Sequence, residues 1–362
     1  MKSLSIDPVQ LPALPFWPAS ELDVRCIQIT QETHDVASFC FAATQPMLFT
    51  FKPGQYVSLK VEIDGRQEMR CYSISTPPSR PYNFSITVKK VPGGLVSNWL
   101  HEHLHEGDCL KVQGPQGGFN IIDQPCDKAL LLSGGSGITP LMSMTRWLYD
   151  TAAEVDLHFV HSARTPDDII YHQELQAIDA RTPKFRLSLV CAGSLSGATW
   201  SGYRGFLNAA MLQQMVPDLY ERTVYVCGPE TYIRAVRGIL QSLDFPMQRY
   251  FEESFGGAVA ATPAPASVLA SEGESATHRV SFSRTGKSVS GVAEETILDI
   301  AGKHGLWIPS ACRMGFCGSC KLRRVSGDVR MNHSGGISDT EINEGYVLAC
   351  CSYAEGDVEF DY

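Results

Sequence analysis

The stretch Pro309-Ser-Ala-Cys-Arg-Met-Gly-Phe-Cys-Gly-Ser-Cys320 decides the fold of the C-terminal part of this chain. It holds Cys312, Cys317 and Cys320 in a C-x4-C-x2-C spacing, and Cys350 follows after a long gap. This spacing is typical of the four thiolates that bind a plant-type [2Fe–2S] cluster. It therefore predicts a small iron–sulfur domain that moves one electron at a time.

The residues around these cysteines favour a cluster over a zinc site, a disulfide framework or inert core cysteines. Gly315 and Gly318 in the same run allow the backbone to curl closely around a cluster and to point N–H groups at its sulfurs. A zinc site usually needs two close cysteine pairs, and a disulfide framework needs an oxidising compartment. Buried cysteines without chemistry are the simplest alternative, since Cys is common in protein cores. Cys351 is an alternative to Cys350 as the fourth ligand.

The composition indicates a folded protein of several domains. A chain of 362 residues predicts two or three domains, and 44% hydrophobic with 19% charged residues is ordinary for such proteins. The net charge of −9 disfavours nucleic acid and anionic membrane surfaces as partners. No apolar run is long enough for a membrane helix, and residues 1–20 lack the apolar core of a signal peptide. We therefore expect a cytoplasmic protein without a membrane or nucleic-acid partner.

The pattern of strands and helices changes along the chain and predicts a multidomain architecture. Residues 1–21 are expected to form an irregular arm, and short strands between turns over 22–123 predict an antiparallel β-barrel. Strands alternate with helices over 124–255, which predicts an α/β domain with a parallel sheet. Residues 256–276, rich in Ala, Pro, Ser and Gly, predict a linker to an α+β domain over 277–362.

The end of one barrel strand, R-C-Y-S-I-S, has the residue types of a flavin site. A flavin needs a cation for its phosphate, a flat ring beside its own ring and small polar donors, and Arg70, Tyr72 and Ser73 offer these three. Further along, Gly94 and Ser97 stand where a helix is expected to begin, and a helix N-terminus suits a diphosphate. Taken alone, the strand motif also fits a surface arginine beside a core tyrosine.

Two glycine-containing turns in the α/β part predict a dinucleotide site. The runs S-G-G-S-G-I-T-P and V-Y-V-C-G-P-E-T each follow a strand and open a helix. Their candidate binding residues are Gly134, Gly135, Gly137, Thr139, Cys227, Gly228 and Pro229. Ligands bind at the carboxyl ends of parallel strands, so we expect Cys227 to touch the nicotinamide ring. The alternative is a tight turn with a buried cysteine.

The sequence leaves the choice between NADH and NADPH open. NADPH requires cations for its 2′-phosphate after the second strand of the nucleotide domain. Ser162 and Arg164 stand there, so NADPH is possible.

Together these motifs resemble the ferredoxin reductase superfamily, in the branch that joins a flavin domain, a nicotinamide domain and a C-terminal [2Fe–2S] domain. The likeness is strongest to NADH-dependent reductases of hybrid-cluster proteins. The chain is also similar to reductase components of Rieske-type oxygenases that act on quaternary amines such as glycine betaine and carnitine. The stretches P-L-M-S-M-T-R-W-L, A-R-T-P-D-D-I-I-Y and E-G-Y-V-L-A-C-C-S carry this likeness. The run G-P-Q-G-G-F, residues 114–119, resembles the members that bind FAD rather than FMN.

The resemblance implies a role for each matching residue. For the flavin it implies Arg70, Tyr72, Ser73, Ser75, Val88, Gly94, Val96 and Ser97. For the nicotinamide nucleotide it implies Gly134, Gly135, Gly137, Thr139, Arg164, Cys227, Gly228 and Pro229, with Tyr72, Ser73 and Cys227 closest to the reaction. For the iron atoms it implies Cys312, Cys317, Cys320 and Cys350.

The implied activity is an NAD(P)H-dependent reductase that passes electrons from NADH through FAD and the [2Fe–2S] cluster to a partner protein. A Rieske-type monooxygenase acting on a quaternary amine is the expected partner, and a hybrid-cluster protein is the alternative. A redox-sensing or electron-storage protein is a different class of function, which the intact nucleotide loops disfavour. A flexible linker over 256–276 suggests that the cluster domain swings between flavin and acceptor.

Three further groups of residues suggest functions that we do not adopt. His101, His103 and His105 are spaced by two, which places them on different helix faces, so we expect surface histidines rather than a metal site. Met142 and Met144 are expected in a helix core. The basic run over 321–324 fits a docking patch and a solvated strand equally well.

Overall fold

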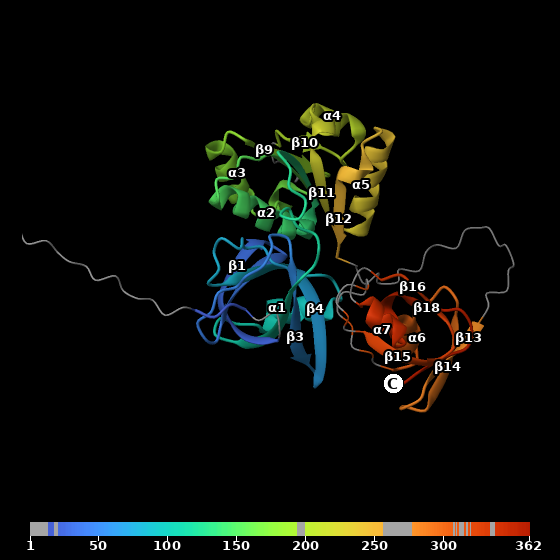
Figure 1. The fold of residues 1–362 in the computed structure, drawn as a ribbon. Coiled ribbons are helices and arrows are strands. Elements are labelled where there is room, and N and C mark those ends of the chain that lie inside the picture. The colour runs from blue at the N-terminus through green and yellow to red at the C-terminus, as the bar shows by residue number, and fades with distance from the viewer. Residues whose placement is uncertain are drawn as a thin grey trace, which may run out of the picture.

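The structure is a computed structural model with three bodies, each built on its own β-sheet (Figure 1). It describes residues 14–17, 21–193, 200–255, 277–306, 308, 310, 315, 318, 320–333 and 337–362. The expected linker over 256–276 lies outside these residues, as do Cys312 and Cys317. The domain boundaries and the swinging motion remain predictions.

The first body is the predicted antiparallel barrel. Its six strands follow the order β4-β3-β6-β1-β2-β5, and a bridge between Ile74 and Ile86 joins the two edges. The strands are β1 (Leu22–Thr33), β2 (Val36–Ala43), β3 (Tyr56–Ile63), β4 (Arg66–Ser73), β5 (Phe84–Lys89) and β6 (Cys109–Gln116), and helix α1 spans Leu95–His103. Every second residue of β3 from Val57 to Ile63, and of β2 from Ala37 to Phe41, packs in the barrel core, as expected for strands with one face on a core.

Trp17 extends the barrel core beyond the expected start of the domain. Its side chain is only 4% exposed and packs edge-on against Phe49, with ring centroids 5.2 Å apart, and stacks on Phe84 at 5.8 Å. Phe16 bridges to Leu48 beside it. This part of the predicted irregular arm is therefore anchored, because a buried indole contributes a large apolar contact area.

The second body is the predicted α/β domain, with six parallel strands in the order β10-β9-β8-β7-β11-β12. The strands are β7 (Lys128–Gly134), β8 (Asp156–Ala163), β9 (Phe185–Cys191), β10 (Tyr203–Arg204), β11 (Thr223–Gly228) and β12 (Tyr250–Ser254). The helices are α2 (Ile138–Asp150), α3 (His172–Arg181), α4 (Ala209–Met215) and α5 (Glu230–Ser242), with single 3-10 turns at Gly135–Gly137, Pro166–Asp168, Leu219–Glu221 and Met247–Arg249.

Both faces of this sheet are buried, as its continuous apolar strands predict. Leu131 of β7 packs in the core beneath α2 and α3, whereas Leu130 and Leu132 pack in a second core with α4 and α5. The expected core methionines Met142 and Met144 are fully buried in the first of these cores.

The strand order creates a reversal point between β7 and β11. The chain leaves β7 through α2 toward β8, and it leaves β11 through α5 toward β12 on the other side. The carboxyl ends of β7 and β11 therefore form a crevice, which is where open α/β sheets bind ligands. The two predicted nucleotide turns meet there.

The third body has the β-grasp arrangement expected of a plant-type ferredoxin domain. Its main sheet has the order β14-β13-β19-β15-β17, with β13 parallel to β19 and the other pairs antiparallel. The strands are β13 (Thr277–Phe282), β14 (Lys287–Val292), β15 (Lys321–Ser326), β17 (Tyr346–Leu348) and β19 (Val358–Phe360), and β16 (Val329–Met331) pairs with β18 (Ser352–Ala354). Helix α6 (Ile297–Lys303) buries Ile297 and Ile300, α7 spans Asp339–Asn343, and a 3-10 turn spans Ala349–Cys351.

A polar network joins the barrel to the parallel-sheet body. Arg146 of α2 donates to the carbonyl oxygen of Ser75 at 2.7 Å and to both oxygens of Glu174, and its guanidinium lies 4.6 Å over the Tyr171 ring. The Tyr171 hydroxyl in turn hydrogen-bonds Thr87 of β5. These bonds fix how the two bodies meet around the sites described below.

The structure corrects one expectation about the histidines and assigns the basic run to a strand. His101 is half-buried rather than on the surface, because its Nε2 lies 2.9 Å from the Val88 carbonyl oxygen, and α1 ends before His105. The basic run over 321–324 forms the start of β15, an interior strand of its sheet. Among the described residues, no helix is both long and apolar enough to span a membrane.

Candidate cofactor and electron-transfer sites

The predicted flavin residues occupy the carboxyl end of β4. Arg70 and Tyr72 share one face of the strand and are half-buried, whereas Ser73 points to the other face and is only 4% exposed. Arg70 donates to Glu68 at 3.2 Å and to the Met69 carbonyl oxygen at 2.7 Å. Burial raises the pKa of Tyr72, so its phenol stays neutral beside the strand. A cation and a neutral ring side by side fit a flavin phosphate and ring system.

Ser73 makes a contact that its neighbouring sequence does not reveal. Its hydroxyl donates to Glu253 Oε2 at 3.3 Å, and Glu253 stands in β12 directly beside Cys227 of β11 in the parallel register. The barrel and the parallel sheet therefore bring these three polar groups to one place. Glu253 lies near the carboxyl end of its strand, where parallel sheets bind ligands. This position could have identified it from the sequence as a candidate site residue.

Glu253 and Cys227 are both held in their neutral forms. Burial raises the pKa of Glu253 to about 8, although the hydrogen bond from Ser73 opposes this shift. Burial also raises the pKa of the Cys227 thiol well above its ordinary value, and the nearby Glu253 adds to the effect. Cys227 is therefore a thiol rather than a nucleophilic thiolate, which suits a residue that packs against a ring.

The raised pKa of Glu253 predicts that stability falls as the pH increases. The folded state keeps the proton up to about pH 8, whereas the unfolded chain loses it near the ordinary value of 4.5. Stability is therefore lost progressively across this interval, because the unfolded state binds fewer protons than the folded state there. We expect Glu253→Gln to flatten the fall in melting temperature of the holoenzyme between these pH values.

Glu252→Gln is the matched control for this prediction. Glu252 adjoins Glu253 in β12 but points to the opposite face, where it pairs with Arg237. Its replacement should leave the pH slope of the melting temperature unchanged. If the Glu253→Gln protein kept the slope of the unmodified protein, the assignment of this proton to Glu253 would be wrong.

The other predicted flavin residues divide into two groups. Gly94 caps α1, and a side-chain carbon there would lie 2.5 Å from Ser97 Oγ and 3.1 Å from the Val91 carbonyl oxygen, so the chain enters the helix closely packed. Val88 and Val96 are buried in the barrel core, which leaves only their backbone groups to face a cofactor. Ser75 is fully buried and donates to the Ser85 carbonyl oxygen at 3.1 Å, so its side chain stabilises the barrel and does not face a cofactor.

The two nucleotide turns touch each other at their glycines. A side-chain carbon on Gly137 would lie 2.3 Å from the Cys227 carbonyl oxygen, and one on Gly134 or Gly228 would lie 2.8 Å from the Tyr232 ring. Gly135 adopts a φ of +51° and has open space where a side chain would be. This open backbone at a strand-to-helix turn is the cradle that a pyrophosphate requires.

A cavity of about 470 Å³ opens over these turns. Gly134, Gly135 and Pro229 line it from the parallel sheet, and Asp35 and Lys89 line it from the barrel. The cavity also borders Ser162, Arg164 and Tyr232, whereas Gly137, Thr139, Cys227 and Gly228 do not line it. Thr139 is buried and donates to the Ser136 carbonyl oxygen at 2.8 Å, so it stabilises the turn. The residues present therefore fit a dinucleotide between the two bodies.

The two candidate cluster cysteines that the structure describes, Cys320 and Cys350, lie side by side. Cys320 precedes β15 and Cys350 lies in the 3-10 turn after β17, and both are buried. The Cys350 N–H points at Cys320 Sγ, 3.4 Å away, which is the kind of backbone donor that surrounds iron–sulfur thiolates. Cys351 instead donates to the Leu348 carbonyl oxygen at 3.6 Å. Gly315 and Gly318 have φ values of +71° and +70°, which glycine adopts without strain.

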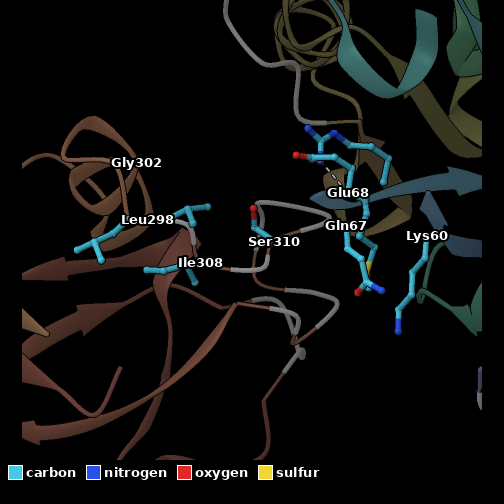
Figure 2. Close-up of a pocket in the computed structure, with 10 residues that line it drawn as sticks. Lys60, Gln67, Glu68, Leu298, Gly302, Ile308 and Ser310 are labelled. Carbon is cyan, nitrogen blue, oxygen red and sulfur yellow. Dashed lines mark hydrogen bonds and ion pairs between the residues drawn. The ribbon is translucent and has the colours of Figure 1, made fainter. Parts of the chain in front are cut away.

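A second cavity, of about 410 Å³, lies between the barrel and the cluster domain. Gln67, Glu68 and Arg70 of β4 line one side, and Ile308 and Ser310 line the other (Figure 2). Ser310 stands two residues before Cys312 in the chain. Strand β4 near Arg70 therefore lies opposite the segment that leads into the predicted cluster loop.

Comparison with known domain families agrees with this division of the chain. Residues 23–121 match the oxidoreductase FAD-binding domain, and residues 131–238 match the oxidoreductase NAD-binding domain. Residues 281–355 match the 2Fe-2S iron-sulfur cluster binding domain. These three matches confirm the predicted cofactor classes and their order.

Similarity to whole proteins decides the family. The chain is 52% identical over 355 residues to the glycine betaine monooxygenase reductase subunit of Chromohalobacter salexigens, covering 96% of each chain. This chain belongs to the ferredoxin reductase family with FAD-, NAD- and [2Fe–2S]-binding domains. A more distant member, the NADH oxidoreductase HCR of Escherichia coli, is 30% identical, with 91% of this chain and 94% of that protein covered.

A solved structure agrees with the fold of this reductase. Phthalate dioxygenase reductase matches with a TM-score of 0.62 at 23% identity, covering 94% of this chain and 98% of the other. This likeness confirms the three-domain architecture. Since the relatives are reductases and reductase subunits, the reductase hands its electrons to a redox partner.

Proposed function

We propose that this reductase is the electron-transfer component of a Rieske-type monooxygenase that acts on a quaternary amine, with glycine betaine as the substrate. The observation that supports it most is the 52% identity to a glycine betaine monooxygenase reductase subunit over 96% of both chains. A cytoplasmic location remains a prediction from the sequence.

Residues at the end of β4 and at the start of α1 take the flavin-binding roles in this proposal. Arg70 holds the flavin phosphate, Tyr72 stacks beside the ring, and Ser73 with Glu253 supplies polar contacts at the ring's edge. The start of α1 at Gly94 and Ser97 offers its N–H groups to the diphosphate. Val88 and Val96 contribute through their backbone, and Ser75 acts indirectly by holding β4 against Arg146.

The nucleotide roles follow from the crevice between β7 and β11. Gly134 and Gly135 let the backbone approach the pyrophosphate, and Pro229 shapes the opposite wall. Cys227 and Gly228 end β11 beside Glu253, which accepts a hydrogen bond from Ser73, and this is where the nicotinamide ring has to meet the flavin. Thr139 and Gly137 keep the two turns in contact.

The cluster roles follow from the buried cysteine pair. Cys320 and Cys350, together with Cys312 and Cys317, supply the thiolates, and the turn over Ala349–Cys351 supplies a backbone donor. When bound, the flavin accepts an electron pair from NADH, and the cluster takes the electrons onward singly. The chain's own task is positioning and exclusion of water, since neither Cys227 nor Glu253 is ionised at neutral pH.

A hybrid-cluster protein is the second candidate partner. The 30% identity to the NADH oxidoreductase HCR over nearly the full length of both chains favours it. The lower identity makes it the weaker candidate of the two.

The test is NADH consumption by the purified reductase with each of two purified acceptors. We expect fast consumption with the oxygenase only when glycine betaine is added, with an equal amount of demethylated amine formed. Consumption with the hybrid-cluster protein alone would overturn the proposal in favour of the second candidate. Consumption with neither acceptor, while NADH still bleaches the flavin, would show that the partner belongs to another class.

A further inference from the structure

An ion-pair network lines one end of the nucleotide cavity. Arg164 follows β8, and its Nη2 lies 3.1 Å from Asp35 Oδ2 and 3.2 Å from Asp168 Oδ1. Lys89 of β5 also contacts Asp35, at 3.1 Å. All four side chains border the same cavity as Gly134 and Gly135, so the network belongs to the nucleotide site.

The position of Arg164 connects this network to the choice between NADH and NADPH. In α/β nucleotide sites, a cation after the second strand binds the 2′-phosphate that distinguishes NADPH from NADH. Here β8 is the second strand of its domain, and Arg164 is the first cation after it. The guanidinium is however already shared between two carboxylates, and one of them, Asp35, comes from the barrel.

The two carboxylates are held firmly in place. Asp168 accepts hydrogen bonds from the Thr165 backbone N–H at 3.0 Å and from its hydroxyl at 2.7 Å. Asp35 accepts a bond from the Thr33 hydroxyl at 3.1 Å, and its carbonyl oxygen accepts one from the Lys90 N–H. Their side chains are 19% and 11% exposed for Asp35 and Asp168, whereas that of Arg164 is 63% exposed. The carboxylates are therefore sheltered and hydrogen-bonded, whereas the guanidinium is largely exposed to solvent.

The charges in this network cancel. Two carboxylates face two cations, so a phosphate arriving at this end of the cavity meets no net positive charge. Burial is the largest single effect on Asp35 and favours its neutral form, but the hydrogen bond and charge of Lys89, together with the Thr33 hydroxyl and His34, keep the pKa of Asp35 below its ordinary value. Asp35 is therefore ionised at neutral pH and repels a second anion.

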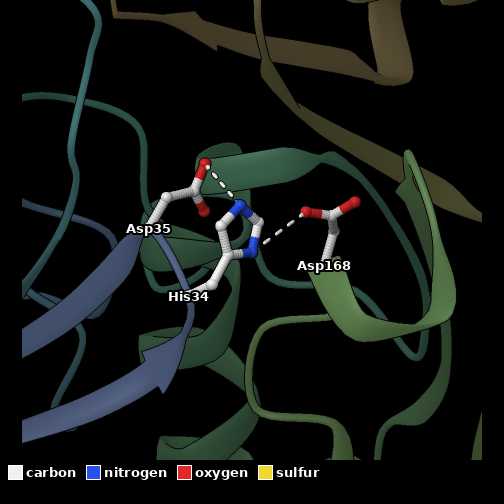
Figure 3. A group of neighbouring side chains, drawn as sticks. All are labelled: His34, Asp35 and Asp168. Atoms are coloured by element: carbon white, nitrogen blue, oxygen red, sulfur yellow. Dashed lines mark ion pairs between the residues drawn. The ribbon is translucent and has the colours of Figure 1, made fainter.

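His34 completes the group but does not turn it into a metal site. Its Nε2 and Nδ1 each lie 3.7 Å from a carboxylate oxygen, of Asp35 and of Asp168 respectively (Figure 3). The three side chains could in principle surround a cation. Both carboxylates are however already neutralised by Arg164 and Lys89, and His34 is exposed. The geometry is that of an ion-pair network.

We propose that Asp35, contributed by the flavin barrel, is a specificity-determining residue that makes this reductase select NADH over NADPH by occupying Arg164. This inference rests on the proposed function and names the nucleotide that it uses. A ribose without a 2′-phosphate leaves the Asp35–Arg164 pair intact, whereas a 2′-phosphate has to break it and then sit beside Asp35 and Asp168. Asp35 of the barrel thus discriminates at the ribose 2′-position of a nucleotide that the parallel sheet binds.

The first test measures binding without any electron transfer. Calorimetry would compare adenosine 5′-monophosphate with its 2′-phosphorylated form, on the unmodified holoenzyme and on Asp35→Asn. We expect the variant to bind the 2′-phosphorylated nucleotide at least about 10-fold more tightly, with a change below about threefold for the other. Equal ratios in the two proteins would overturn the inference and leave the proposed function intact. If neither nucleotide bound the unmodified protein, both would be wrong.

Asp150→Asn is the matched control. Asp150 also joins the two bodies, through a 2.7 Å contact with Arg80, and is equally sheltered, but it lies outside the cavity lining. Its replacement should leave nucleotide preference unchanged. A gain in Asp150→Asn equal to that in Asp35→Asn would show that looser contact between the bodies, rather than the charge at Asp35, sets the preference.

The second test asks whether Arg164 is the released cation. The rate of flavin reduction by NADPH relative to NADH should rise in Asp35→Asn by the same factor as the binding ratio. In the double variant Asp35→Asn with Arg164→Ala, this gain should disappear. A gain that survives the loss of Arg164 would contradict the role assigned to that side chain.

Discussion

Replacing Cys350 with serine is expected to abolish electron delivery to the partner while leaving the reduction of the flavin by NADH intact. Cys350 is buried beside Cys320, with its N–H 3.4 Å from Cys320 Sγ, and we propose both of them as iron ligands. Loss of one thiolate should lower cluster-dependent reduction of the partner by more than about 100-fold. Ferricyanide, which accepts electrons from the flavin directly, should still be reduced at the original rate.

Cys351→Ser is the matched control for this prediction. Cys351 is the next residue, is equally buried and donates to the Leu348 carbonyl oxygen, a bond that a serine hydroxyl can also make. Its replacement should keep the visible absorbance of the cluster and the delivery of electrons. A Cys351→Ser protein without a cluster, beside a Cys350→Ser protein that retains it, would reverse the assignment of the fourth ligand.

Replacing Gly137 with alanine is expected to have the largest effect on the reduction of the flavin by NADH. The new side-chain carbon would lie 2.3 Å from the Cys227 carbonyl oxygen and 2.4 Å from Gly228 Cα, both backbone atoms. The paired strands β7 and β11 leave these atoms little room to yield, since Ser133 and Cys227 are register partners. Displacement of the two turns by about 1 Å should slow flavin reduction by at least about 100-fold.

The controls for Gly137→Ala separate turn geometry from general stability. Gly238 lies in α5 with no atom within 4 Å of the added carbon, so Gly238→Ala should leave the rate unchanged and raise helix stability by at most about 1 kcal/mol. If the Gly137→Ala protein does not fold, Gly134→Ala replaces it, because the three atoms nearest to its added carbon all belong to the Tyr232 side chain. Unchanged flavin reduction in a folded Gly137→Ala protein would contradict the assigned nucleotide site.

The sequence was sufficient for features that depend on local pattern and spacing. The alternation of strands and helices predicted the parallel sheet, and the turn at Ser133–Pro140 predicted the crevice beside β7. The spacing from Cys312 to Cys320 predicted the small iron–sulfur domain at the C-terminal end of the chain. In each case the short run is compatible with few local conformations, so its pattern alone predicts the local structure.

Contacts between distant parts of the chain could not be predicted in the same way. Glu253 meets Ser73 across 180 residues, and Asp35 meets Arg164 across 129 residues. Nothing in the neighbouring sequence of Asp35 distinguishes it from any acidic turn residue. Its role arises only because the barrel and the parallel sheet pack against each other. The predicted surface position of His101 is wrong for a related reason, since its partner is a carbonyl oxygen of β5.

The most direct test of the electron path is a rapid-mixing experiment that follows flavin and cluster absorbance after anaerobic addition of NADH. We expect two phases in the unmodified protein: bleaching of the flavin, followed by reduction of the cluster. The Cys350→Ser protein should show only the first phase, at an unchanged rate. Reduction of the cluster before the flavin, or a second phase that persists in Cys350→Ser, would contradict the order of transfer proposed for this reductase.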